Sequence, residues 1–250
     1  MSRLVIAHRG HKVGAPEQTL AAYRMAGELG ATMLEVDLRL TRDRVAVLMH
    51  DRTVNRTTSG TGVVADLDSA QIAQLDAGSW FDPRFAGERI PRLDELFSLA
   101  DELGIALCIE AKGDAGAENL ETSLLAAREI ARRGRLAIDV VASFDHAALA
   151  AAAIAVPGVR TAPDRLPERG HSTADDLIAQ AKAAGASIIQ HHFADLERSV
   201  VEAVQAAGIE VWAWPPATIE EAQVAYDSGA IGLMGDDVAA IVEVLRANGD

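Results

Sequence analysis

A repeated pattern of helix, glycine and apolar strand is the feature of this sequence that most restricts its fold. An Ala-rich helical stretch ends at a Gly and a short apolar run follows, at residues 27–36, 101–110, 182–191, 205–214 and 226–235. Gly suits the left-handed position that ends a helix, and the apolar run has the composition of a strand buried on both faces. Each copy therefore predicts a helix followed by a strand of a parallel sheet.

Three further apolar runs, at 4–7, 139–144 and 158–162, bring the number of expected main strands to eight. The expected helices lie near 17–29, 93–103, 117–133, 146–155, 174–184, 195–207, 218–228 and 236–247. Eight alternating strand and helix units in 250 residues predict one (β/α)₈ TIM barrel spanning residues 1–250. A doubly wound open sheet is the alternative, but no Gly-x-Gly-x-x-Gly turn follows the first strand to favour it.

Residues 51–91 break this rhythm. They contain no long amphipathic pattern, and they are rich in Thr and Gly before a stretch that holds Trp80, Phe81 and Phe85. A long irregular segment inside a compact domain usually serves a site. We therefore expect a small insertion after the second strand, lying over the barrel mouth, with the aromatic residues as its hydrophobic anchors.

The charge balance restricts the partners that this chain could bind. The formal net charge of −14 argues against a nucleic-acid partner, because phosphate backbones are bound by clustered Lys and Arg. A single cysteine, Cys108, cannot form an internal disulfide, and the apolar run at 4–7 is too short for a signal peptide core or a membrane span. The expectation is a soluble, cytoplasmic protein; its acidic surface indicates no oligomeric state.

Active sites of (β/α)₈ enzymes are built at the C-terminal ends of the strands, so polar residues there are candidates for catalysis. Glu35 and Asp37 share one face of the second strand, and two buried like charges need a compensating cation or hydrogen-bond donors. The neighbouring strand ends add two His, a third carboxylate and two bases: His8, Arg9, His50, Glu110 and Lys112. Hard divalent cations prefer oxygen ligands, and Arg and Lys can hold a phosphate beside the ion. The set predicts metal-assisted acid–base chemistry; an ion pair of the carboxylates with Arg9 or Arg39 is the structural alternative.

Taken together, these residues resemble the glycerophosphodiester phosphodiesterase family. The matching motifs are His8-Arg9-Gly10, Ala15-Pro16-Glu17, Glu35-x-Asp37, His50-Asp51, Arg56-Thr57-Thr58-x-Gly60, Glu110-x-Lys112 and Trp212. The resemblance implies a (β/α)₈ barrel with a small insertion after the second strand, and hydrolysis of glycerophosphodiesters to sn-glycerol 3-phosphate and an alcohol. It also implies one divalent metal ion, Mg²⁺ or Ca²⁺, on Glu35, Asp37 and Glu110. His8 and His50 would be the acid–base pair, and Arg9 and Lys112 would hold the phosphate.

Two further substrate-binding candidates are Glu17 and Trp212. Glu17 is either an ordinary residue of a first helical turn or one that orders Arg9 and the first loop. Trp212 either belongs to the barrel core or forms a wall of the substrate pocket, and its place near a strand end favours the wall. His191 and His192 end the sixth expected strand, and one of them is expected to face the barrel axis.

Three positions depart from the family's pattern. Gln18 stands where Asn is usual, Ala213-Trp214-Pro215 replaces Thr-Val-Asn, and Met234-Gly235-Asp236 replaces Ile-Thr-Asp. The expected metal ligands and both His are unchanged, so we expect these departures to affect the alcohol group of the substrate more than the reaction.

Two other functions stay open at this point. One is another metal-dependent (β/α)₈ enzyme, such as an aldolase or an enolase-like lyase, which also uses carboxylates at strand ends. The other is a phosphodiester-binding relative without catalysis. For a phosphodiesterase, the nucleophile is either the glycerol 2-hydroxyl, which gives a cyclic phosphate, or water.

Overall fold

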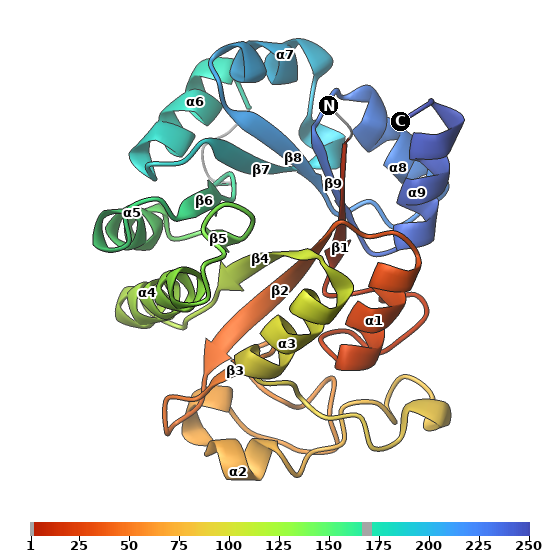
Figure 1. The fold of residues 1–250 in the computed structure, drawn as a ribbon, viewed down its shortest axis with the longest axis vertical. Coiled ribbons are helices and arrows are strands. Elements are labelled where there is room, and N and C mark those ends of the chain that lie inside the picture. The colour runs from red at the N-terminus through yellow and green to blue at the C-terminus, as the bar shows by residue number, and fades with distance from the viewer. Residues whose placement is uncertain (1–2, 167–171) are drawn as a thin grey trace.

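The computed structural model describes residues 3–166 and 172–250, and its centre is a nearly closed barrel of eight parallel strands (Figure 1). Their order around the barrel is β6-β5-β4-β2-β1-β9-β8-β7, and a parallel bridge between Asp164 and Gln190 links β6 to β7. The strands are β1 (Leu4–His8), β2 (Met33–Leu40), β4 (Ala106–Ala111), β5 (Val140–Ser143), β6 (Arg160–Pro163), β7 (Ile188–His192), β8 (Glu210–Trp214) and β9 (Gly232–Gly235). The (β/α)₈ fold predicted from the repeat is confirmed.

Helices surround the barrel on the outside (Figure 1). They are α1 (Leu20–Glu28), α3 (Leu93–Leu103), α4 (Gly116–Arg132), α5 (His146–Ala155), α6 (Ala174–Ala183), α7 (Arg198–Ala206), α8 (Ile219–Asp227) and α9 (Val238–Ala247). Each lies within a few residues of its predicted range; α7 begins late because the short 3₁₀ helix η4 (Phe193–Asp195) precedes it. In the described part of the chain, none of the helices combines the length and apolarity that crossing a bilayer requires.

Short local signals set the helix ends. Side chains at the residue before α1, α5, α6, α8 and α9 each accept a hydrogen bond from a backbone amide of the first turn: Thr19, Asp145, Thr173, Thr218 and Asp237. The five glycines of the repeat all have positive φ, as predicted; Gly104, with φ of 66°, caps α3 in the left-handed conformation. These glycines turn the chain from each helix into the next strand.

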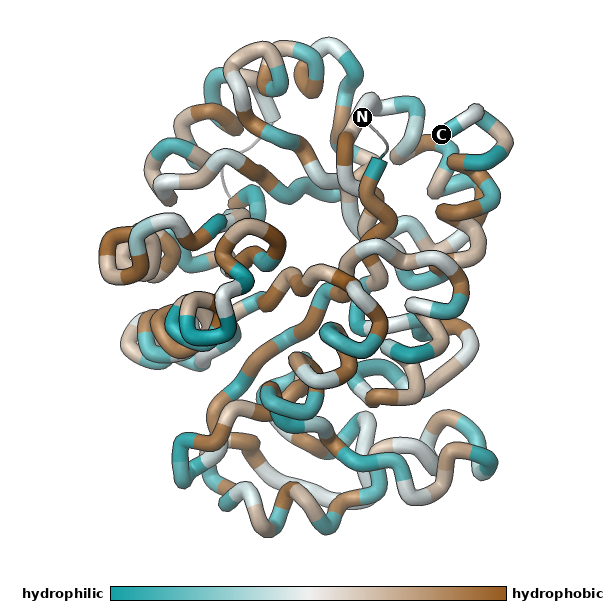
Figure 2. The backbone as a smooth tube through the Cα atoms, in the orientation of Figure 1, coloured by the Kyte–Doolittle hydropathy of each residue, from teal (hydrophilic) through white to brown (hydrophobic). Residues whose placement is uncertain are grey.

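Alternation along the strands separates two apolar cores. Leu34 and Val36 of β2 belong to the large core between the strands and the helices, whereas Trp212 belongs to a small core that fills the barrel interior. Figure 2 shows brown, hydrophobic stretches along the central strands and frequent teal segments on the outer helices and loops. Glu35 and Asp37, on the opposite face of β2 from Leu34, are buried on the barrel side. The predicted alternation of β2 is confirmed.

The insertion after the second strand has an apolar core of its own. It follows β3 (Ala46–Leu48), which pairs antiparallel with β2, and contains η1 (Val64–Asp66), α2 (Ser69–Ile72) and η2 (Pro83–Phe85). That core consists of Val47, Met49, Val54, Val64, Ile72, Ala77 and Ile90. The rings of Trp80, Phe81 and Phe85 pack edge to face on one another outside that core, and Trp80 is exposed, so they are not the hydrophobic anchors that the sequence led us to expect. In Figure 1 the insertion lies outside the ring of helices, next to β3.

Candidate active site

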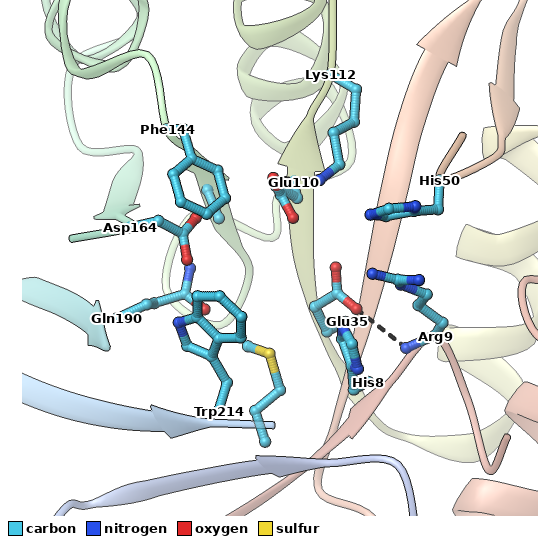
Figure 3. Close-up of a pocket in the computed structure, with 12 residues that line it drawn as sticks. His8, Arg9, Glu35, His50, Glu110, Lys112, Phe144, Asp164, Gln190 and Trp214 are labelled. Carbon is cyan, nitrogen blue, oxygen red and sulfur yellow. Dashed lines mark hydrogen bonds and ion pairs between the residues drawn. The ribbon is translucent and has the colours of Figure 1, made fainter. Parts of the chain in front are cut away.

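A pocket of about 160 Å³ opens at the C-terminal ends of the strands (Figure 3). It is lined by His8, Arg9, Glu35, His50, Glu110, Lys112, Ala142, Phe144, Asp164, Gln190, Trp214 and Met234. In Figure 3, Glu35 and Glu110 lie between two walls. We call the side with His8, Arg9, His50 and Lys112 the basic wall, and the side with Phe144, Asp164, Gln190 and Trp214 the far wall. Six of the residues predicted from the sequence thus meet in one pocket.

Three carboxylates converge beside this pocket. Glu35 and Asp37 lie on β2, and Asp37 is in register with Glu110 on β4. One oxygen of each of the three lies within 4.8 Å of the others. Burial raises the pKa of Glu35 well above its usual range, with Asp37 adding to the effect, and burial raises the pKa of Glu110 to about 7. The protein alone does not keep all three groups charged at neutral pH.

The residues present fit a divalent cation. Glu35 Oε1 is buried without a hydrogen-bond partner in the described part of the chain, although Glu35 Oε2 accepts a hydrogen bond from the backbone of Arg9 at 3.0 Å. A buried oxygen left in this way costs free energy unless a ligand satisfies it. The donor set is made of carboxylate oxygens alone, which suits Mg²⁺ or Ca²⁺ better than a softer ion. Glu35, Asp37 and Glu110 are therefore the residues that would hold the metal.

Two bases surround the carboxylates. Lys112 Nζ lies 2.6 Å from Glu110 Oε1 and 3.0 Å from Asp37 Oδ1, and Arg9 Nε lies 3.1 Å from Asp37 Oδ2. Burial opposes ionisation of Asp37, but Lys112 and Arg9 outweigh it and hold the pKa of Asp37 well below its usual range. The ion pair with Arg9 therefore exists, while Arg39 turns instead to the backbone oxygen of His50. Arg9 and Lys112 also line the pocket, where they can meet an anion.

Gln18 is hydrogen-bonded to one of the carboxylates from outside the pocket. Its Nε2 donates to Asp37 Oδ2 at 2.6 Å, and its Oε1 accepts a hydrogen bond from the buried hydroxyl of Tyr23. Both Arg9 and Gln18 have φ of 60°, an uncommon backbone conformation for residues with a side chain, and this conformation directs both side chains at Asp37. Gln18 thus orients a candidate metal ligand. It does not line the pocket, and the expectation that this departure affects the alcohol group stays a prediction.

His8 is held by a carboxylate from the last strand end. Its Nδ1 lies 2.6 Å from Asp236 Oδ1, and Asp236 Oδ2 lies 2.8 Å from Lys12 Nζ. Burial lowers the pKa of His8, and this effect outweighs the hydrogen bond that the ring donates to Asp236, which raises the pKa. A neutral ring that donates from Nδ1 to Asp236 keeps the lone pair on Nε2 free for a proton from the pocket.

His50 is held in a similar way through the insertion. Its Nδ1 lies 2.8 Å from Asp51 Oδ1, and Arg56 joins Asp51 to Glu17 with Nε–O and Nη–O distances of 2.7 to 2.9 Å. Burial lowers the pKa of His50. Glu17 also lies 3.4 Å from Arg9, and it does not line the pocket. Of its two interpretations, the structure supports the one in which Glu17 orders the first loop.

Comparison with known proteins places this chain in a family. A model of the glycerophosphoryl diester phosphodiesterase family matches residues 8–240. The chain belongs to this family. It is therefore a phosphodiesterase, an enzyme of the hydrolase class.

Whole-chain relatives agree with this assignment. The glycerophosphodiester phosphodiesterase of Caldanaerobacter subterraneus subsp. tengcongensis is 32% identical over 251 residues, covering 100% of both chains. The structure of a phosphodiesterase from Oleispira antarctica in complex with the product sn-glycerol-3-phosphate superposes with a TM-score of 0.88 at 26% identity, covering 97% of this chain and 96% of that one. A glycerophosphodiester phosphodiesterase from Agrobacterium tumefaciens superposes with a TM-score of 0.81 at 27% identity, covering 98% and 100%.

In this phosphodiesterase Trp212 does not line the pocket. Its side chain is fully buried in the barrel interior, and its Nε1 donates to Glu210 Oε2 at 3.1 Å. Gly232 of β9 makes room for it, since a Cβ there would lie 2.7 Å from the indole. The residue of β8 that lines the pocket is Trp214. The structure therefore supports the core interpretation of Trp212, and the wall position belongs to the residue two places later.

The far wall of the phosphodiesterase is the part that the sequence did not reveal. Phe144 and Asp164 directly follow β5 and β6, and Gln190 lies on β7. His191 is fully buried and hydrogen-bonded to Ser172. His192 is exposed, and its ring packs edge to face on Trp214 with the ring centroids 5.8 Å apart. The available signal was position alone: these residues lie at the ends of strands, where a barrel builds its site.

Proposed function

We propose that this phosphodiesterase hydrolyses glycerophosphodiesters to sn-glycerol 3-phosphate and an alcohol with one divalent metal ion, Mg²⁺ or Ca²⁺. The observation that carries the proposal is a cluster of three carboxylates, two of which line the same pocket as two histidines. The names of the whole-chain relatives and the product bound to the Oleispira antarctica enzyme support the substrate class. The family match removes the reason for considering an aldolase or an enolase-like lyase.

Binding of the phosphodiester depends on charge placed locally, because the chain as a whole is acidic. Arg9 and Lys112 line the basic wall and would contact the phosphoryl oxygens as charge develops on them. A bound divalent ion would add Lewis-acid stabilisation of the same oxygens. The paired Arg9 and Lys112 are already positioned by Asp37, so little reorganisation is needed when substrate arrives.

Proton transfer is the role proposed for His8 and His50. Each ring has a carboxylate at Nδ1, which fixes the ring and directs Nε2 towards the pocket. One imidazole takes the proton of the nucleophile, and the other, in its protonated form, gives a proton to the oxygen of the leaving alcohol. The nucleophile is the glycerol 2-hydroxyl or water; accumulation of a cyclic phosphate, followed by phosphorus NMR during turnover, distinguishes the two.

The decisive assay is release of sn-glycerol 3-phosphate from glycerophosphocholine and glycerophosphoethanolamine. We expect release to stop in EDTA and to return with Mg²⁺, Mn²⁺ or Ca²⁺. A His8→Ala, His50→Ala double variant is expected to lose activity while keeping its melting temperature and its metal binding. Full activity of that variant, or release that EDTA leaves unchanged, would overturn the proposed mechanism. The cytoplasmic location expected from the sequence stays a prediction, for cell fractionation to check.

A further inference from the structure

Asp164 is a buried carboxylate that the proposed mechanism does not use. It is 4% exposed, it lines the pocket, and its Oδ2 has no hydrogen-bond partner in the described part of the chain. Its backbone is held on both sides, because its N–H donates to Ser143 O at 3.1 Å and its carbonyl oxygen lies 2.8 Å from His146 Nε2. The backbone is thus fixed, and the side chain lines the pocket with an acceptor left free, which is a feature of a ligand site.

The charges around Asp164 call for a cation. Burial raises the pKa of its carboxyl group well above the usual range, and Glu110 adds to this effect. Lys112 acts in the opposite direction, but its ammonium group is already 2.6 Å from Glu110 and 3.0 Å from Asp37. A positively charged ligand group would give Asp164 the partner that the protein does not provide.

Aromatic rings stand on either side of Asp164 in the far wall (Figure 3). The rings of Phe144 and Trp214 are 6.3 Å apart between centroids and meet edge to face at 89°. Phe144 is 39% exposed, so a ligand can reach its ring, although Lys112 Nζ already lies 5.9 Å from the ring centroid. Aromatic faces next to a carboxylate are the usual surroundings of a bound ammonium group, because ring quadrupole and carboxylate both attract positive charge.

We propose that the far wall binds the alcohol part of the substrate, and that this alcohol carries a positively charged nitrogen, as choline and ethanolamine do. The inference rests on the proposed function, since it assumes that the basic wall holds the phosphodiester. The two walls face one another across Glu35 and Glu110 (Figure 3). A substrate with an anionic phosphate and a cationic alcohol matches that division of charge: Arg9 and Lys112 take the phosphate, and Asp164 with Phe144 and Trp214 takes the nitrogen.

The test compares glycerophosphocholine with its uncharged isostere, the 3,3-dimethylbutyl ester of glycerol 3-phosphate, which has carbon in place of the nitrogen. Glycerophosphoethanolamine is the third substrate. We expect kcat/KM to favour the choline ester over the isostere by about 10- to 100-fold, the usual range for a buried contact to a charged group. In Asp164→Asn that ratio should fall to near one. Phe144→Leu should lower kcat/KM several-fold for the choline ester and less for the ethanolamine ester, because the smaller ammonium group depends more on the carboxylate.

Asp175→Asn is the matched control. Asp175 is exposed on α6, so this variant removes the same charge from the protein outside the pocket and should leave the ratio unchanged. An equal loss on both esters in Asp164→Asn would show that Asp164 acts on glycerol or on the metal, and would overturn the inference. A wild-type enzyme that treats the two esters alike would overturn it as well.

Calorimetric binding of both esters in the presence of Ca²⁺ separates this inference from the proposed function. One outcome is that neither ester is hydrolysed, yet the choline ester binds at least tenfold more tightly than the isostere and Asp164→Asn removes the difference. The proposed reaction would then be wrong, and the ammonium site would stand. If both esters are hydrolysed and bind equally, the reaction stands and the ammonium site falls. Equal or undetectable binding without hydrolysis refutes both.

Discussion

Affinity of the carboxylate cluster for a divalent ion is expected to rise about tenfold between pH 6 and pH 8. The ion binds the ionised carboxylates, so any proton on them must leave first. Burial raises the pKa of Glu110 to about 7. With that value about a tenth of Glu110 is ionised at pH 6 and about nine tenths at pH 8, which corresponds to roughly 1.4 kcal/mol of binding free energy. The raised pKa of Glu35 makes this a lower limit.

Isothermal titration calorimetry with Ca²⁺ and with Mg²⁺ measures the effect directly. Titrations at pH 6, 7 and 8 in two buffers of different ionisation enthalpy give the affinity and the number of protons released. Glu110→Gln is the control, because it keeps an oxygen ligand but removes the titrating group; it should bind more weakly and with a flatter pH dependence. An affinity constant within about twofold across this range, with no proton release, would refute the reasoning.

The same shift makes the stability of the metal-free protein depend on pH. The pKa of Glu110 is raised above its ordinary value of 4.5, so the folded state holds a proton there that the unfolded chain has already lost. This contribution is fully present below pH 4.5 and is lost as the pH rises through about 7. The lowered pKa values of His8 and His50 act in the opposite direction, so the contribution of Glu110 is measured against Glu110→Gln. In EDTA the melting temperature of the wild type should fall relative to that of Glu110→Gln across this window. A difference between the two proteins that stays constant from pH 5 to 7 contradicts this account.

Three substitutions test the support behind the site. Asp236→Asn removes the carboxylate at His8 and should lower kcat about 100-fold with KM and metal affinity little changed, as steady-state kinetics and calorimetry would show; a change in KM alone would contradict it. Gln18→Leu removes two buried hydrogen bonds, one to a charged group, and should cost about 3 kcal/mol in urea unfolding; a loss below about 1 kcal/mol would argue against that role. Gly10→Ala places a Cβ 2.7 Å from a neighbouring Cβ at a φ of 86°, so it should lower the melting temperature more than Gly87→Ala, where φ is 95° and the space is open.

The half of the site formed by β1, β2 and β4 could be predicted because alternation and motifs act together there. Glu35 and Asp37 reveal their shared face by the apolar residues between them, and Glu110 with Lys112 repeats that spacing on the next strand. These are contacts between neighbouring strands in register, so a pattern of period two is enough to bring the side chains together.

The other half depends on depth along a strand, which a period of two does not give. Trp212 and Trp214 have the same parity, and only the contact of Trp212 with Gly232 places it in the interior and leaves Trp214 at the pocket. Gln18 is a similar case, because its partner Asp37 lies 19 residues away and its positive φ has no signature in the sequence. For Asp164, a single acidic residue after an apolar run is common at any surface turn.

Charge in the pocket explains why substrate and metal should depend on one another. When all three are ionised, the carboxylates of Glu35, Asp37 and Glu110 outnumber Arg9 and Lys112 by one, and this charge state repels a phosphodiester. A divalent ion reverses the sign and leaves a single net positive charge, which matches the single negative charge of a phosphodiester. Coupling between two ligands is reciprocal. If the metal raises the affinity for a phosphodiester by some factor, a bound phosphodiester must raise the affinity for the metal by the same factor. A bound ion therefore lets the ionised cluster accept an anion, in a chain whose overall charge is −14.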